Sequence, residues 1–368
     1  MKAYFQELFT SRWDRLLALS VLLIFLIGLL FLYSTSLNRG LTLKGNYALR
    51  QILWMVLAFF FFCGTLSVPF KRFYDLAYFL YGLNLFLLVL VLVLGRATRL
   101  GAQRWLDIGS IVFQPSEFVK ITFVLAVSRF LAGKDLRDGS QRELLGAFFL
   151  TLIPALLILK EPHLGTSLIL FLMLLGILYV AGLPRHYFAW LFFAFLIAGP
   201  LGWFFMKEYQ KQRLLVFANP GLDPLGAGYT VIQSRISIGS GSLLGKGLFS
   251  GTQNRLNFLP ERHTDFIFSV IGEEWGFFGG TFLVFLYLFM MKRGLAIAGR
   301  ARGEFARLVA AGLTTMLTVH IFVNLAMTMG FLPVVGLPLP FVSYGGSWLT
   351  ACMIAVALIL NVEREGDL

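Results

Sequence analysis

The segment Leu259-Pro260-Glu261-Arg262-His263-Thr264-Asp265-Phe266-Ile267-Phe268 joins two very different parts of the chain. Before it lies a polar, basic and glycine-rich stretch, and after it begins a long apolar run. An apolar run of this length is typical of a membrane-spanning helix. The ionisable cluster therefore lies where a polar loop meets a membrane helix, and the remaining apolar runs are expected to form a frame around it.

The composition indicates an integral membrane protein. Fifty-eight per cent of the residues are hydrophobic and 14% are charged, whereas soluble domains carry about 25% charge. Lipid offers no partner for unpaired backbone groups, so each long apolar run is predicted to be a helix. We expect an all-α polytopic membrane protein, a single domain over 1–368, with about ten transmembrane helices at 16–35, 47–68, 76–95, 114–132, 143–160, 165–181, 185–205, 265–291, 307–331 and 341–361.

The distribution of basic residues predicts the orientation. An even number of spans places both termini on one side, and Lys and Arg concentrate in the segments on that side. Because such segments face the cytoplasm, both termini are predicted to be cytoplasmic, and 206–264 is predicted to be a large extracytoplasmic loop between helices 7 and 8. The same rule explains the net charge of +12. No basic stripe or soluble module accompanies this charge, so nucleic acid is not an expected partner.

Two charged residues lie inside a predicted span, which is costly and marks a functional candidate. Pro115 suits a first helical turn, and Glu117 suits the positive end of that helix. Glu117 and Lys120 are three residues apart and share one helix face. They either form a structural ion pair or line a polar cavity that opens outward.

Other polar residues lie in the predicted outer segments. Arg104, beside Trp105, is either an interfacial anchor or a ligand for a diphosphate, which arginine binds in bidentate fashion. His163 lies in a sharp turn and is either a turn residue or a ligand. Three prolines and paired glycines in 332–347 predict irregular backbone that walls a cavity, with a plain loop as the alternative. No spacing resembles a zinc site or a phosphate loop.

Six motifs in the chain also occur, in this order, in a known family. They are Gly101-Ala102-Gln103-Arg104-Trp105-Leu106, Gln114-Pro115-Ser116-Glu117, Asp223-Pro224-Leu225-Gly226-Ala227-Gly228-Tyr229, Gly245-Lys246-Gly247, the segment 259–268 and the run 338–347. With the ten apolar runs, they make the chain resemble the SEDS proteins (shape, elongation, division and sporulation) over nearly its whole length. Arg262 before His263, and Val334-Val335 before Gly336, resemble the RodA-like branch more than the FtsW-like branch.

The resemblance implies a peptidoglycan glycosyltransferase of the cytoplasmic (inner) membrane. Such enzymes polymerise lipid II, a disaccharide-pentapeptide on undecaprenyl pyrophosphate, during cell elongation. The implied partners are a class B penicillin-binding protein, which is a transpeptidase, and other membrane proteins of the elongation complex. The family's essential carboxylate matches Asp265, and its functional polar pair matches Glu117 and Lys120. His163 stands where relatives usually carry Asp, so an acidic role there does not carry over.

The chemistry of such a transfer gives the residues provisional roles. An α-linked diphosphate donor and a β-linked polymer require inversion, which needs one base and no covalent enzyme nucleophile. Asp265 is the proposed general base, with a helix N-cap as the alternative role. Lys120, Arg104 and Arg213 are candidates to neutralise the diphosphate. His163 and Ser343 are candidates to contact sugar or phosphate.

A divalent cation, Mg²⁺ or Mn²⁺, is a candidate cofactor that would bridge to Asp265 or Glu117. The glycines of 221–251 suggest backbone freedom for a loop that covers or admits a glycolipid. Two other functions stay open at this point. One is a flippase or transporter for lipid-linked precursors, since transporters also combine many spans with intramembrane charges, and the other is a scaffold that only positions the transpeptidase.

Overall fold

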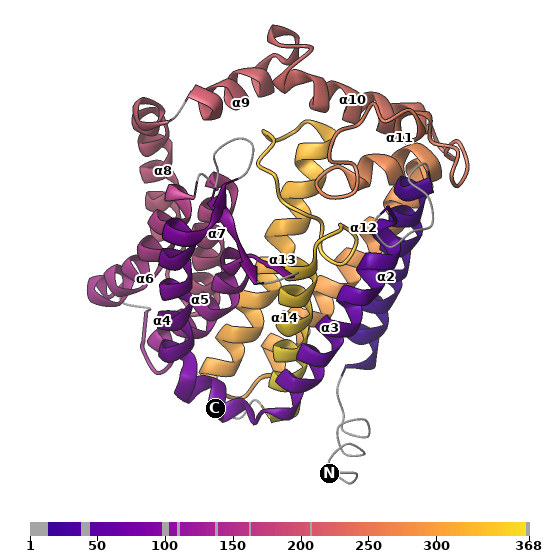
Figure 1. Ribbon diagram of the computed structural model, residues 1–368. Helices are drawn as coiled ribbons and strands as arrows, with labels where there is room; N and C mark the ends of the chain where they lie inside the picture. The colour runs from indigo at the N-terminus through magenta and orange to yellow at the C-terminus, as the bar shows by residue number, and fades with distance from the viewer. Residues whose placement is uncertain are drawn as a thin grey trace.

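The computed structural model describes residues 14–37, 45–97, 103–108, 111–136, 139–161, 163–206 and 208–365. Each of the ten predicted spans coincides with a helix in this part of the chain (Figure 1). These helices are α2 (Arg15–Ser36), α3 (Tyr47–Ser67), α4 (Phe70–Leu94), α5 (Pro115–Leu131), α6 (Gln141–Lys160), α7 (Leu164–Val180), α8 (Arg185–Phe205), α12 (Ile267–Arg300), α13 (Glu304–Met329) and α14 (Gly346–Glu365). The predicted all-α polytopic fold is confirmed.

Seven of the described helices are long and apolar enough to cross a membrane, namely α2, α3, α4, α6, α12, α13 and α14. Helix α7 is apolar but shorter. The expectation of ten crossings therefore stays a prediction for α5, α7 and α8. The outward faces of the peripheral helices carry large exposed apolar side chains, such as Phe60 and Phe79, as a lipid-facing surface requires.

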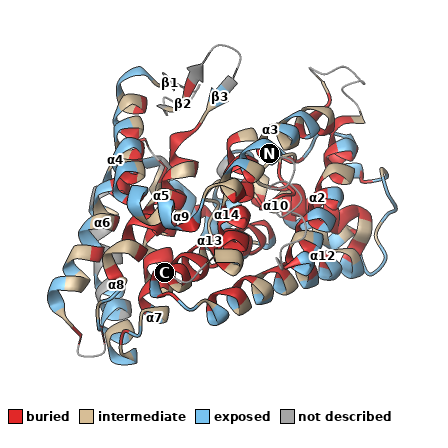
Figure 2. Cartoon of the chain, turned by 90° about the horizontal axis from the view of Figure 1, so that it is seen from below, coloured by how far each residue is buried: buried red, intermediate tan, exposed pale blue. Residues whose placement is uncertain are grey.

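Helices α13 and α14 form the centre of the bundle. Helix α14 packs against α3, and α13 packs against α12, α7 and α5. Figure 2 shows these two helices largely buried, whereas α4, α6 and α8 expose one face. Close packing needs small residues here: a Cβ atom at Gly312 of α13 would lie 2.8 Å from Val124 and 3.0 Å from Ile177. A small residue at such a helix contact is typical of membrane helix bundles.

One end of the bundle gathers charged side chains from three helices. Asp14 caps the N-terminus of α2 by accepting hydrogen bonds from Leu16 N and Leu17 N, and it also pairs with Arg293 and Arg300 of α12. Arg300 also approaches Glu363 near the end of α14, at 3.5 Å. The start of α2 and the end of α14 therefore lie at the same end, opposite α9, α10 and α11 (Figure 1). Residues 1–13 and 366–368, which hold the termini themselves, lie outside the described residues.

The predicted loop 206–264 contains helices that the sequence did not predict. They are α9 (Glu208–Ala218), the short 3₁₀ turn η2 (Pro220–Leu222), α10 (Ala227–Ser240) and α11 (Thr252–Arg255). Helix α10 packs against α12 and α13 through two buried serines. Ser234 Oγ donates to Thr328 O at 2.6 Å, and Ser237 Oγ donates to Ser269 O at 3.2 Å. Because serines occupy two of its buried positions, apolar periodicity did not reveal this helix.

The glycines of this segment fix the loop against α12, which corrects the expectation of backbone freedom. A Cβ atom at Gly241 would lie 1.9 Å from Gly272 O, and one at Gly245 would lie 2.1 Å from Glu274 O. Gly245 also has a φ of +81°, which other residues rarely adopt. These two positions require glycine because the two backbones touch.

Two adjacent buried carboxylates of α12 hold the same loop. Glu273 accepts hydrogen bonds from Lys246 Nζ at 2.8 Å and from Gln253 N at 3.0 Å. Glu274 accepts from Ser34 Oγ of α2 at 2.5 Å and from Phe249 N at 2.9 Å. Buried charges persist only where such partners satisfy them, so residues 246–255 are firmly attached to the bundle.

Helix α12 is broken at Gly276, where φ is +65° and ψ is −158°. A Cβ atom there would lie 2.3 Å from Gly245 N. The backbone NH groups of Phe277 and Phe278 instead bond to the Ser242 and Leu243 carbonyls. The loop therefore supplies partners for the backbone groups that the break releases.

Two further irregular segments lie toward the end of the bundle that is opposite Asp14. A three-stranded antiparallel sheet, unexpected from the sequence, is formed by β1 (Arg96–Ala97), β2 (Gln103–Ile108) and β3 (Ile111–Phe113), with β2 in the centre. The segment 331–345 between α13 and α14 has irregular backbone, as its prolines predict. Its second half is nevertheless largely buried, since Leu337, Leu339 and Phe341 are at most 1% exposed. It contributes one wall of the site described next.

Candidate functional site

Asp265 lies in the turn just before α12, and the adjoining segments hold its backbone. Asn324 of α13 donates from Nδ2 to Asp265 O at 2.9 Å and to Leu337 O at 2.6 Å. The N-cap of α12 is Phe266, and no side chain caps this helix end. The alternative role of Asp265 as an N-cap therefore finds no support in the geometry. Asp265 as a residue is partly exposed, so it is available for chemistry.

The surroundings of Asp265 raise its pKa from 3.8 to about 7. Loss of hydration is the main cause, and the neighbouring Glu261 carboxylate adds to it. Arg213 and Arg104 act in the opposite direction, since positive charges favour the ionised carboxylate. A carboxylate with a pKa near neutrality is well matched to accept a proton at physiological pH.

Three of the predicted ligands surround one small cavity. Arg104 of β2, His163 before α7 and Arg213 of α9 line a cavity of about 70 Å³, together with Pro333, Val334 and Val335 of the irregular loop. Arg104 Nε donates to Glu161 O at 3.0 Å, and Arg213 Nη1 donates to Val334 O at 3.2 Å. Two guanidinium groups thus reach the cavity from opposite segments, which is a suitable arrangement for binding an anion.

His163 links this cavity to Asp265. It is buried and hydrogen-bonds to the backbone of Gly336, and the Asp265 carboxylate lies 3.4 Å from where a Gly336 Cβ would be. Burial, together with the positive charges of Arg104 and Lys120, lowers the pKa of His163 from 6.5 to about 3. His163 is therefore neutral at physiological pH and adds no positive charge.

Glu117 and Lys120 form the predicted pair, but at a buried place. Lys120 Nζ lies 2.6 Å from Glu117 Oε2, and Lys120 is fully buried. The ammonium group also lies 2.9 Å from His320 Nε2 and 4.1 Å from the centre of the Trp348 ring. Because an ammonium group can only donate, His320 Nε2 is the acceptor in this contact when Lys120 is charged.

The structure places most, but not all, of the predicted site residues around one cavity. Asp265, Arg104, Arg213 and His163 interact electrostatically around the cavity, and Lys120 acts on His163 from the inner side. Ser343 lies behind this group. It is 1% exposed, donates from Oγ to Thr264 O at 2.5 Å and accepts from Leu339 N at 2.8 Å. Its observed contacts hold the irregular loop against the turn of Asp265, and its predicted contact with substrate stays a prediction.

Three polar residues of the site were not predicted. His320 and Asn324 lie on one face of α13, four residues apart, which was the only signal in the sequence. Glu161 is buried with no hydrogen-bond partner for either carboxyl oxygen among the described residues. Burial raises its pKa to about 8, against the opposing charge of Arg104, so it carries a proton at neutral pH.

The described side chains do not form a metal site by themselves. Nowhere in the described ranges do three or more His, Cys, Asp or Glu residues gather as metal ligands would. Glu117, one of the two predicted ligands, is occupied by the Lys120 ammonium group. Mg²⁺ and Mn²⁺ prefer several oxygen ligands, and the groups nearest Asp265 include two arginines. A divalent cation stays a prediction, and no step below depends on it.

Comparison with known proteins identifies the family. The FtsW/RodA/SpoVE family, described as "cell cycle protein", matches residues 14–367. The chain belongs to this family. The resemblance to the SEDS proteins is thereby confirmed over nearly the whole sequence.

Named relatives and solved structures agree with this family. Peptidoglycan glycosyltransferase MrdB of Escherichia coli K12 is 42% identical over 322 residues, which cover 87% of this chain and 84% of the relative. A solved structure of a peptidoglycan synthase complex contains a chain that is 32% identical with a TM-score of 0.82, covering 96% of this chain and 98% of that one. The rod shape determining protein RodA of Thermus thermophilus is 30% identical with a TM-score of 0.72 and the same coverage.

Proposed function

We propose that this member of the FtsW/RodA/SpoVE family is a peptidoglycan glycosyltransferase that polymerises lipid II. The observation that carries the proposal is the pairing of one partly exposed aspartate, with a pKa near 7, with a cavity lined by two arginines. A relative with 42% identity is named as an enzyme of this activity. The carboxylate supplies a base, and the arginines supply a site for the leaving diphosphate.

The proposed transfer is a single inverting displacement. The 4-hydroxyl oxygen of the acceptor sugar attacks the anomeric carbon of the donor, and its proton passes to the Asp265 carboxylate. The bond from that carbon to the diphosphate oxygen breaks, and undecaprenyl diphosphate leaves with the electron pair. The products are a glycan longer by one disaccharide and the lipid diphosphate, so neither a nucleophile of the protein nor a redox partner is needed.

The positively charged residues of the site act on the diphosphate in two ways. Arg104 and Arg213 are positioned to bind the diphosphate directly, because both line the cavity. Lys120 is buried and acts electrostatically on His163, so it acts on the cavity through its charge. His163, being neutral, offers a ring nitrogen for a hydrogen bond to phosphate or sugar.

The cellular setting is part of the same proposal. We place the end of the bundle with Asp14 and Arg300 in the cytoplasm, and the site with Asp265 outside the cytoplasmic membrane. A class B penicillin-binding protein is the proposed partner, together with other membrane proteins of cell elongation. A solved complex that contains a similar chain is described as coordinating polymerisation and crosslinking, which supports a transpeptidase partner.

Reconstitution separates this function from transport of lipid-linked precursors and from a scaffold role. The purified chain, with its transpeptidase partner, is incubated in liposomes with labelled lipid II, and polymer length and lipid movement are both measured. Glycan polymer from wild-type protein, and none from Asp265→Asn, is the expected result. Movement of lipid II across the bilayer without polymer would indicate a transporter, and growth supported by Asp265→Asn would indicate a scaffold.

A further inference from the structure

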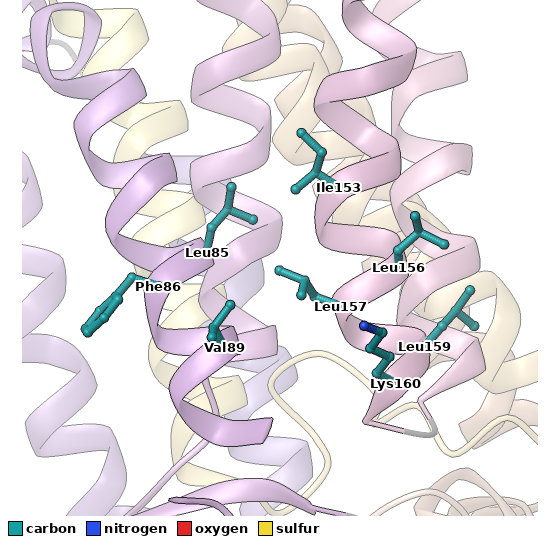
Figure 3. Close-up of a pocket in the computed structure, with 8 residues that line it drawn as sticks. All are labelled: Leu85, Phe86, Val89, Ile153, Leu156, Leu157, Leu159 and Lys160. Atoms are coloured by element: carbon teal, nitrogen blue, oxygen red, sulfur yellow. The ribbon is translucent and has the colours of Figure 1, made fainter. Parts of the chain in front are cut away.

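A second, larger cavity lies on the lipid-facing side of the bundle, between α4 and α6. Its volume is about 940 Å³. Its lining residues are Leu85, Phe86, Val89, Ile153, Leu156, Leu157, Leu159 and Lys160. Seven of the eight are apolar, so the groove suits a hydrocarbon chain. Figure 3 shows the groove between the two helices, with Leu157 directed toward α4.

The one charged residue of the groove lies at its outer end. Lys160 is the last residue of α6 and lines the groove, and Figure 3 shows its side chain along α6, below Leu157. Its side chain is exposed and has no ion pair with any residue that the structure describes. A lysine at the end of an apolar groove provides a site for an anionic head group above a buried tail.

The outer end of the groove is continuous with the site of Asp265. Lys160 is followed directly by Glu161, whose carbonyl oxygen binds Arg104 Nε at 3.0 Å. Arg104 in turn lines the smaller cavity with Arg213 and acts electrostatically on Asp265. Two cations, first Lys160 and then Arg104, therefore lie between the lipid-facing groove and the Asp265 carboxylate.

We propose that the groove between α4 and α6 binds the tail of a polyprenyl diphosphate, with Lys160 and Arg104 on its diphosphate. This inference rests on the proposed function and names the lipid site that it uses. A lipid diphosphate carries more negative charge than phosphatidylglycerol, which has a single phosphate. A single tail also matches a single groove, and two cations linked through Glu161, which follows Lys160 and binds Arg104, match a diphosphate better than one phosphate.

The test measures lipid binding in the Asp265→Asn background, so that no turnover consumes the ligand. Native mass spectrometry in detergent micelles gives the Kd of undecaprenyl diphosphate, with phosphatidylglycerol as competitor. Val89→Trp narrows the groove from its exposed α4 side, and Lys160→Gln removes its charge. Val93→Trp is the matched control, since Val93 lies one turn further along α4 and does not line the groove. Lys292→Gln is the control for loss of an exposed lysine.

The proposal predicts a defined pattern of Kd values. Val89→Trp raises the Kd about tenfold, because a few methyl groups lose their apolar contacts. Lys160→Gln raises it about fivefold for the diphosphate and less for undecaprenyl monophosphate. The two controls leave it unchanged. A Kd that is unchanged in both groove variants overturns the proposal, as does equal displacement by phosphatidylglycerol.

The outcome is separable from that of the proposed function. If wild-type protein makes no glycan polymer but the groove variants lose undecaprenyl diphosphate, the lipid site stands and the polymerase assignment fails. If wild-type protein makes polymer and Val89→Trp keeps both its Kd and its rate, the polymerase assignment stands and this lipid site is wrong.

Discussion

Replacing the Asp265 carboxyl group by the amide of asparagine separates a catalytic role from a structural one. The amide has nearly the same shape but cannot accept the proton of an attacking hydroxyl group. Loss of a general base costs about 10²- to 10⁴-fold in rate. The wild-type rate should rise tenfold per pH unit below the pKa of about 7 and level off above it. The variant should be slower at every pH, and its pH–rate profile should lack the rising limb below about pH 7.

The same substitution should make the protein more stable. The folded-state pKa of Asp265 is raised, so the folded protein binds a proton that the unfolded chain releases between pH 3.8 and about 7. Ionised Asp265 therefore opposes folding, and the penalty grows through that window and is constant above it. A shift of this size corresponds to about 4 kcal/mol as an upper bound. Because Asp265 is partly exposed, we expect about 1–2 kcal/mol after solvent screening.

The assay combines lipid II polymerisation with thermal unfolding in detergent micelles at several pH values. We expect Asp265→Asn to unfold at a higher temperature than wild type at pH 8, with the difference shrinking toward pH 4. A residue that serves only as a helix cap would instead lose stability on substitution. The reasoning is refuted if the variant polymerises at the wild-type rate, or if it is less stable than wild type at pH 8.

Three further substitutions test the surroundings of Asp265. Lys120→Met leaves Glu117 charged and buried, and should lower the free energy of unfolding by about 3–5 kcal/mol. The double variant with Glu117→Gln should recover part of this loss. Unfolding experiments on the single and double variants measure both free energies. Asn324→Leu removes the hydrogen bond to the Asp265 carbonyl, so kcat should fall while the Kd for undecaprenyl diphosphate stays constant; equal kcat would exclude this positioning role. Glu261→Gln removes a negative charge near Asp265, so the pKa of Asp265 should fall. The acid limb of the pH–rate profile should then move to lower pH. An acid limb that stays in place or moves to higher pH would contradict the assigned charge effect.

The helices of the bundle were predictable because their signal is local. Continuous apolar runs leave helix as the only state in lipid, and all ten predicted runs coincide with helices. The pairing of Glu117 with Lys120 was equally local, since three residues of helix bring the two side chains together. The position of Asp265 just before α12 was predictable from the abrupt change in polarity at that point of the sequence.

The rest of the site depends on contacts between distant parts of the chain. His320 reaches Lys120 from another helix, 200 residues away in sequence, and no motif surrounds it. Helix α10 was missed because two of its buried positions are serines, of which Ser234 hydrogen-bonds to both α12 and α13. From the sequence, Gly241 and Gly245 were interpreted as a source of backbone flexibility. In the structure they mark places where two backbones touch. Composition cannot distinguish these two uses of glycine.

The break at Gly276 determines how this protein meets a bilayer of a given thickness. An unbroken α12 of 34 residues would be roughly 51 Å long, far more than the ~30 Å of hydrocarbon in a typical membrane. The part after the break, 277–300, is roughly 36 Å long and fits with a modest tilt. The hydrophobic length that must match the bilayer is therefore set by 277–300, and the turn that holds Asp265 lies beyond the break.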